Sequence, residues 1–204
     1  GSGKSSLVQL IARLYDATEG AVLVGGRDVR DYDLAALRDA VGIVLQKNVL
    51  FTGTVRENLQ WGNPQASDDE LLAACRAACV DEFLDRIGGL DGELGQGGAG
   101  VSGGQKKRLC IARTLALNPD VILFDEPCSA LDPISTLAIE DLMSSIVADR
   151  AIVIVTHNME QASRVSNRTA FFYMGDMVEY DETDEIFQRP KDKRLNDYLT
   201  GMFS

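Results

Sequence analysis

Residues 101–132 constrain the fold more than any other stretch of the chain. Ser102 can act as an N-cap and Gln105 can reach back to close a capping box, so we expect a helix to begin there. Gly103 and Gly104 place no side chain in front of the open N–H groups of this helix. Because those N–H groups and the positive end of the helix dipole favour an anion, this helix start is suited to contact a phosphate.

The same segment continues into a strand that ends in two acidic residues. Asn118-Pro119 predicts the end of the helix, because the residue before a proline disfavours helical conformation. The apolar run 121–124 is typical of a strand buried on both faces, and Asp125 and Glu126 follow it. Two carboxylates at the C-terminal edge of a parallel strand indicate a metal site.

A glycine-rich turn at the start of the chain opens into a predicted helix that ends at Gly20. The turn matches the second half of the phosphate-binding pattern G-x-x-x-x-G-K-[ST]. Lys4 is expected to neutralise β- and γ-phosphate oxygens, and the Ser5 hydroxyl to bind Mg²⁺. The residues predicted to bind the nucleotide in this turn are Gly1, Ser2, Gly3, Lys4, Ser5 and Ser6.

Two more predicted strands deliver polar residues to the same edge of a sheet. Residues 41–45 form a buried-strand pattern that ends in Gln46, which can help to hold Mg²⁺ or the attacking water. Residues 151–155 form another and lead to His157, which can contact the γ-phosphate. Strand, helix and strand in series predict a parallel sheet. Asp125 would then hold the metal and Glu126 would act as general base, which together predict nucleotide hydrolysis.

The remaining segments predict a helical insertion and a C-terminal hairpin. Residues 51–100 show helical patterns without strands, which indicates a helical subdomain, and the glycine-rich residues 92–100 are expected to form a mobile linker. Residues 169–173 and 177–180 flank a Gly-Asp turn and predict a hairpin. Short helices are expected around 184–187 and 195–202.

Composition excludes several classes of function. The net charge of −11 argues against a nucleic-acid surface, because clustered positive charge supplies most of that affinity. The four cysteines form no CxxC pair and His157 is the single histidine, so a zinc site is not expected. No apolar run approaches the roughly 20 residues of a membrane span.

Five motifs in order give the chain a resemblance to a known family. VSGGQ at 101–105, the 121–126 strand with its acids, Gln46, Ser129-Ala130-Leu131-Asp132 and His157 resemble the signature motif, Walker B, Q-loop, D-loop and switch histidine of ATP-binding cassette (ABC) transporters. The resemblance covers essentially the whole chain and implies an ABC ATPase domain over 1–204 that uses ATP and Mg²⁺.

The resemblance also implies partners and shared sites. Two such domains pair head to tail, so that Ser102, Gly103, Gly104, Gln105 and Asp132 of one domain serve the nucleotide held by Lys4 of the other. A transmembrane permease subunit or domain is the expected partner, which would place the chain at the cytoplasmic face of the cell membrane.

The two halves of the chain resemble different transporters. Residues 41–62 and 89–113 are similar to exporter-type domains, whereas 125–204 are similar to the ATPase subunit of phosphate importers. The C-terminal region distinguishes subfamilies best, so phosphate import is the preferred prediction and an exporter domain the alternative. A recombined gene would explain the mixture, as would a divergent natural lineage.

Two alternatives from other classes are a soluble ABC ATPase in DNA repair or translation and a non-catalytic fragment. The acidic balance and the lack of coiled-coil heptads count against the former.

Family members carry strands before the position of Gly1, including the one that leads into the phosphate loop, and an aromatic residue that stacks on adenine. We therefore expect an α/β P-loop sheet without its N-terminal strands, and weak nucleotide binding with little ATPase activity from this chain alone.

Overall fold

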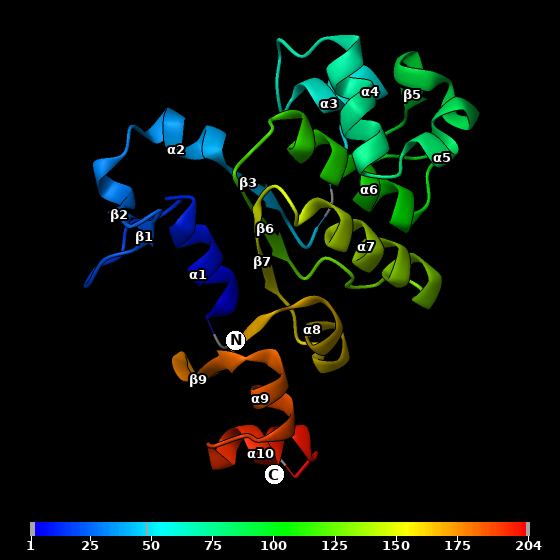
Figure 1. Ribbon diagram of the computed structural model, residues 1–204. Coiled ribbons are helices and arrows are strands. Elements are labelled where there is room, and N and C mark those ends of the chain that lie inside the picture. The colour runs from blue at the N-terminus through cyan, green and yellow to red at the C-terminus, as the bar shows by residue number, and fades with distance from the viewer. Residues whose placement is uncertain (1–2, 48, 203–204) are drawn as a thin grey trace.

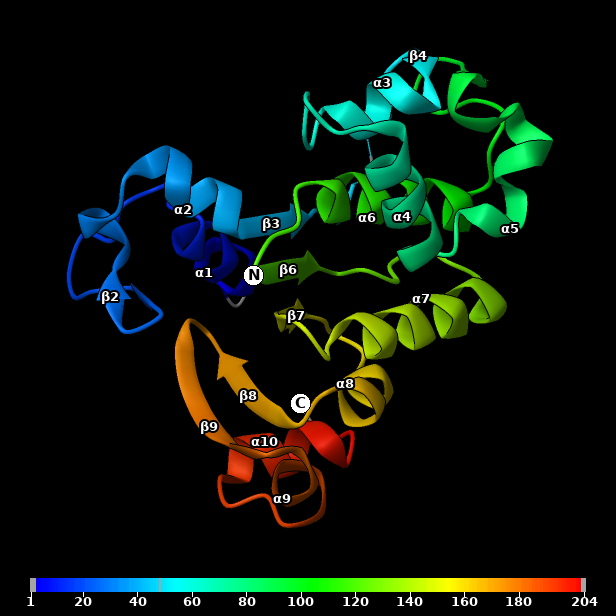
Figure 2. The same cartoon turned by 45° about the horizontal axis from the view of Figure 1, so that its top comes forward.

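The computed structural model describes residues 3–47 and 49–202, and its centre is a three-stranded parallel sheet. The strands are β3 (Val41–Val44), β6 (Val121–Asp125) and β7 (Ala151–Val155), in the order β3-β6-β7. Their pairing is in parallel register, with Val44 opposite Phe124 and Asp125 opposite Val155. The carboxyl ends of the three strands therefore meet at one edge, as Figure 2 shows.

The central strand β6 is buried on both faces because its alternate side chains enter two different cores. Ile122 and Phe124 pack into a large cluster with residues of helices α3 (Val55–Gln60), α4 (Asp68–Ala77), α6 (Gly103–Ala116) and α7 (Pro133–Ile146). Leu123 enters a smaller cluster with Val8 of α1 (Lys4–Ile11) and Leu37 of α2 (Leu34–Ala40). The continuous apolar run thus confirms the prediction of a two-sided buried strand.

Strand β7 differs from the buried strand that its apolar run predicts. Val155 is its only buried residue, whereas Val153 is 38% exposed. The reason is its place at the edge of the sheet, because β6 is its only neighbour among the described strands.

The first helix is shorter than predicted. It ends at Ile11 rather than at Gly20, because Arg13 takes a left-handed φ of 50° and reverses the chain before Leu14. The chain continues through β1 (Leu23–Val24) and β2 (Arg27–Asp28), which pair antiparallel, and a 3₁₀ turn at Val29–Asp31.

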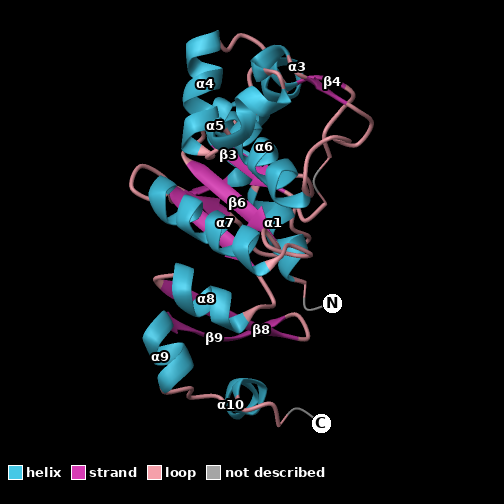
Figure 3. Cartoon of the chain, turned by 90° about the vertical axis from the view of Figure 1, so that its right-hand side faces the viewer, coloured by secondary structure: helices cyan, strands magenta, loops and turns pink. Residues whose placement is uncertain are grey.

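The region between the sheet strands β3 and β6 is mainly helical and lies to one side of the sheet (Figures 1 and 3). It adds α5 (Asp81–Leu84) and 3₁₀ turns at Asp85–Ile87 and Gly89–Asp91 to the helices above. The prediction that it contains no strand is wrong: β4 (Gly53–Thr54) pairs antiparallel with β5 (Glu93–Leu94). The second strand of this pair lies within residues 92–100, which the sequence predicts as a mobile linker. Leu94 is buried there, so this part of the segment is packed against the core.

The C-terminal part confirms the predicted hairpin and lies at the opposite end of the molecule from α3 to α5 (Figure 3). Strands β8 (Arg168–Tyr173) and β9 (Asp176–Glu182) pair antiparallel, with an irregularity between Phe171 and Phe172. Helix α8 (Met159–Val165) precedes the hairpin, and α9 (Thr183–Gln188) and α10 (Lys193–Leu199) follow it. No helix among the described residues is both long and apolar enough to cross a membrane.

Candidate active site

The site lies where α1 begins against the carboxyl ends of β6 and β7. Gly3, in left-handed conformation with φ 78°, caps α1, so Lys4 and Ser5 stand in the first turn of the helix. The Ser5 hydroxyl donates to Asp125 Oδ1 over 3.0 Å, across 120 positions of sequence. The structure thus brings together two of the three residues that the sequence predicts as metal ligands. Gly1 and Ser2 lie outside the described residues.

These oxygen atoms fit Mg²⁺ by their chemistry. Mg²⁺ is held by one or two carboxylates together with hydroxyl, water and phosphate oxygens. Asp125 is 8% exposed and its carboxylate faces a hydroxyl, so a cation there would meet hard oxygen donors in a partly water-excluded place. Gln46 is not brought to this pair: its side-chain amide donates instead to Ser129 Oγ over 3.3 Å.

Glu126 and His157 meet just beyond the ends of their strands, one residue after β6 and two residues after β7. Glu126 Oε2 lies 2.5 Å from His157 Nδ1, and the Glu126 N–H donates to the Val155 carbonyl. Glu126 takes a left-handed φ of 49°, a conformation that residues other than glycine rarely adopt. Its carboxylate therefore contacts a residue from the loop after β7.

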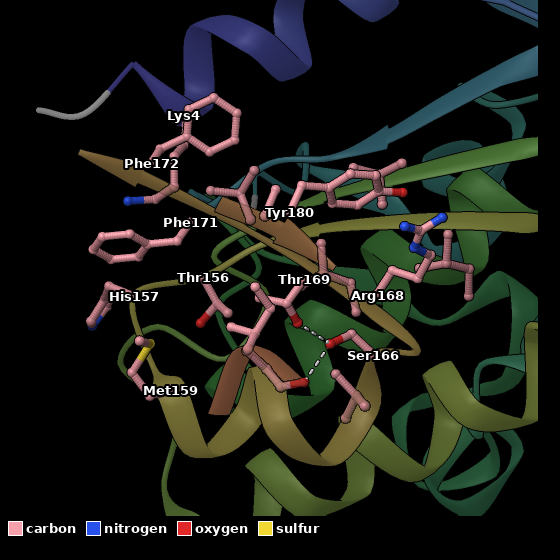
Figure 4. Close-up of a pocket in the computed structure, with 18 of the residues that line it drawn as sticks. Lys4, Thr156, His157, Met159, Ser166, Arg168, Thr169, Phe171, Phe172 and Tyr180 are labelled. Atoms are coloured by element: carbon pink, nitrogen blue, oxygen red, sulfur yellow. Dashed lines mark hydrogen bonds between the residues drawn. The ribbon is translucent and has the colours of Figure 1, made fainter. Parts of the chain in front are cut away.

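A cavity of about 1300 Å³ opens beside this edge of the sheet. Its walls come from α1, β7 and the hairpin β8–β9, and Figure 4 shows Lys4, Phe172 and His157 gathered at one end of it, with Arg168 at the other. The cavity runs along the edge of β7 that has no strand neighbour among the described residues.

The predicted capping box at the start of α6 is present but lies apart from these residues. Ser102 accepts from the Gln105 N–H, and the Gln105 side chain accepts from the Ser102 N–H over 2.9 Å. Ser102 and Gly103 are exposed, whereas Gly104 packs on Ser135 at the start of α7.

Asp132 is the N-cap of α7 and contacts Ser135, the residue against which Gly104 packs. It accepts from the Ser135 hydroxyl over 2.6 Å and from the Ser135 N–H over 2.9 Å, and these hydrogen bonds lower the pKa of Asp132. The described structure therefore gives Asp132 a local structural partner on its own chain.

Lys107 is a residue that the sequence reasoning missed. Its side chain is fully buried, and its ammonium group donates to the backbone carbonyl of Leu45 over 3.1 Å and to that of Gln46 over 3.5 Å. Burial lowers its pKa. The available signal was spacing, because Lys107 stands four residues before the buried Ile111 and three after Gly104, on the inner face of α6.

Comparison with known proteins agrees with this geometry. The family model described as ABC transporter matches residues 1–129. A solved structure titled as that of a bacterial Atm1-family ABC exporter with ATP bound is 32% identical to the chain, with a TM-score of 0.87. The match covers 100% of this chain and 35% of that one, so the chain spans about a third of the length of the exporter chain. The parallel P-loop sheet, the paired Ser5 and Asp125, and both comparisons lead to one conclusion: the chain belongs to the ABC transporter family, as its ATPase domain.

Proposed function

We propose that the chain is the ATP-binding and ATP-hydrolysing domain of an ABC exporter. The observation that carries the proposal is the convergence of Ser5, Asp125, Glu126 and His157 at one edge of the sheet, from segments up to 152 positions apart. Each of these residues is of the type that nucleotide hydrolysis requires, and two direct contacts join them in pairs.

The site residues divide into binding and proton-handling groups. The N–H groups at the start of α1 and the Lys4 ammonium would bind and orient the phosphates of ATP. Ser5 and Asp125 would hold Mg²⁺, which when bound neutralises charge on the phosphate oxygens. The Glu126 carboxylate would accept the proton of the attacking water, and His157, 2.5 Å away, would hold that carboxylate in place.

The start of α6 would serve a second ATPase domain. Ser102 and Gly103 are exposed, and the two hydrogen bonds of the capping box are made between Ser102 and Gln105. Helix α6 has 14 residues and its N-terminus is exposed to solvent. Its N–H groups and the positive end of its dipole could therefore bind an anion held by a partner domain. We therefore propose head-to-tail pairing, in which Ser102 to Gln105 and Asp132 complete the nucleotide site of the other domain.

Export is favoured over the phosphate import that the C-terminal sequence predicts. The exporter structure matches the whole chain, including residues 125–204 that carried the importer resemblance. That resemblance is therefore no longer a reason to prefer import.

An exposed aromatic surface beside α3 supports a membrane partner. Phe51 and Trp61 stack with ring centroids 4.5 Å apart, yet they are 40% and 66% exposed, and Val49 nearby is 54% exposed. Exposed aromatic patches of this kind mark protein contacts. We propose that the helical region 51–100 is a subdomain that presents this surface to the transmembrane domain.

ATP hydrolysis is tested in the protein that carries this chain with its natural flanking sequence, purified in detergent. We expect Mg²⁺-dependent phosphate release that falls at least a hundredfold in Glu126→Gln, because the general base is lost. Retained ATP binding in that variant would show that the fold is intact. Glu19→Gln, an exposed glutamate away from the site, is the matched control. Equal activity of the two variants would refute the assigned role of Glu126.

The direction of transport is tested in inside-out vesicles that expose the ATPase domain. An exporter accumulates its cargo in the lumen when ATP is added outside. ATP-dependent release of preloaded inorganic phosphate from the lumen would instead support phosphate import and contradict the exporter proposal.

A further inference from the structure

Lys107 is a buried cation that joins helix α6 to the backbone that follows strand β3. Its relative exposure is 0%, and its ammonium group donates to the carbonyls of Leu45 and Gln46, which directly follow strand β3. Lys107 itself lies in the second turn of α6, which begins with the exposed capping box of Ser102. A single side chain thus connects the start of α6 to the backbone that carries Gln46.

Gln46 in turn contacts the segment that follows Glu126. Its side-chain amide donates to Ser129 Oγ over 3.3 Å. The contacts therefore run from α6 through Lys107 to the Gln46 backbone, and from the Gln46 side chain to the loop after Glu126.

Burial of the Lys107 ammonium group has a desolvation cost. Transfer of a charged group from water into a protein interior is unfavourable unless hydrogen bonds replace its hydration, and a neutral apolar side chain would fill the same volume at lower cost. The two carbonyls partly offset this penalty only while residues 45 and 46 keep their present position. The charge thus favours one conformation of the backbone at residues 45 and 46 over others. It restricts the position of this backbone without adding to the stability of the fold.

We propose that Lys107 is a positioning residue for ATP hydrolysis, which holds the Gln46 backbone at a fixed distance from α6 so that the Gln46 side chain can serve the nucleotide site. The proposal rests on the proposed function. Lys107 touches neither substrate nor metal and acts through Gln46. It also gives the helix start that faces a partner domain a direct mechanical connection to the local site.

The first test compares steady-state ATPase kinetics of the full-length protein and three variants. Lys107→Met keeps the length of the side chain but cannot donate, and we expect kcat to fall about tenfold with KM for ATP changed less than twofold. Lys107→Gln can still donate to one carbonyl and should lose about threefold. Lys106→Met is the matched control, because Lys106 is the adjacent lysine on α6 but is partly exposed, and it should leave kcat unchanged.

The second test asks whether Lys107 acts through Gln46. In a double-mutant cycle, each Lys107 substitution should change kcat less than twofold when Gln46→Ala is already present. Multiplication of the two effects would overturn the proposal and leave Lys107 a purely structural residue. Thermal unfolding of the same proteins provides the contrast, because a loss of stability should be the same with Gln46 or Ala at position 46.

The outcomes separate this proposal from the proposed function. A wild-type protein without Glu126-dependent hydrolysis would overturn the proposed function and this inference with it. An active wild type with a fully active Lys107→Met would overturn this inference alone. Should Lys107→Met fail to fold, the cycle is completed with Lys107→Gln, and additive effects there refute the proposal equally.

Discussion

Removal of Arg164 should destabilise the protein more than neutralisation of its partner Glu140. Arg164 on α8 donates to both oxygens of Glu140 on α7, over 2.8 and 2.9 Å. The pair is asymmetric, because the Glu140 side chain is 6% exposed and that of Arg164 is 45% exposed. The variant Arg164→Met leaves a buried carboxylate, whereas Glu140→Gln leaves an arginine that can turn into water.

The exposure of the two partners sets the magnitudes. Loss of one partner of a fully buried ion pair costs about 3–5 kcal/mol. Arg164 is about half exposed, so water can enter the space it leaves, and Gln161 Nε2 remains 3.4 Å from Glu140 Oε1. We therefore expect Arg164→Met to cost about 2–3 kcal/mol and Glu140→Gln about 1 kcal/mol. For a chain of this size those losses lower Tm by roughly 5–10 °C and roughly 2–4 °C.

The assay is urea unfolding followed by circular dichroism, with the midpoint and slope fitted for each variant. Arg189→Met is the matched control, because Arg189 is 75% exposed and pairs with Glu185 at i,i+4, where such pairs contribute less than about 0.5 kcal/mol. A Glu140→Gln variant that is less stable than Arg164→Met would refute the reasoning from burial.

Three further predictions follow from packing and titration. Gly42→Ala should lower the free energy of unfolding by about 1–3 kcal/mol in denaturant titration, because the added methyl would overlap Thr114 Cγ2 and lie 3.1 Å from Pro119 Cγ. Gly104→Ala places a methyl 2.7 Å from Ser135 Oγ and should destabilise the wild type, but it should become neutral or stabilising in a Ser135→Gly background, where the higher helix propensity of alanine remains. Burial raises the pKa of the Cys75 thiol from 9.0 to about 11 in the folded protein, so the thiol of the unfolded chain is deprotonated at lower pH. The free energy of unfolding should therefore fall by roughly 1–3 kcal/mol as pH rises from 9 to 11. Chemical unfolding across that range should show the fall, and Cys75→Ala should lack this part of it.

Local sequence signals predicted the parts of the fold that depend on local interactions. The capping box of Ser102 and Gln105 involves residues only three apart, and the continuous apolar run 121–124 predicts a strand that is buried on both faces. The contact of Asp125 with Ser5 was also predictable, because the strand pattern and the P-loop pattern place both residues at one sheet edge.

Features that depend on distant contacts were missed or misjudged. The bridge of Gly53–Thr54 to Glu93–Leu94 joins two-residue strands about forty positions apart, for which strand propensity carries little information. The early end of α1 depends on a left-handed Arg13, a residue type that gives no turn signal. Lys107 was overlooked because a lysine is expected at the surface, and only its position on the inner face of α6 pointed elsewhere.

The outer edge of β7 is open to a further strand. Its backbone N–H and C=O groups on that side have no strand partner among the described residues, and Val153 and the apolar lining of the neighbouring cavity lie beside them. Such an edge can accept an extended segment in register with residues 151–155. A strand that paired there would satisfy these backbone groups and cover Val153, which is 38% exposed.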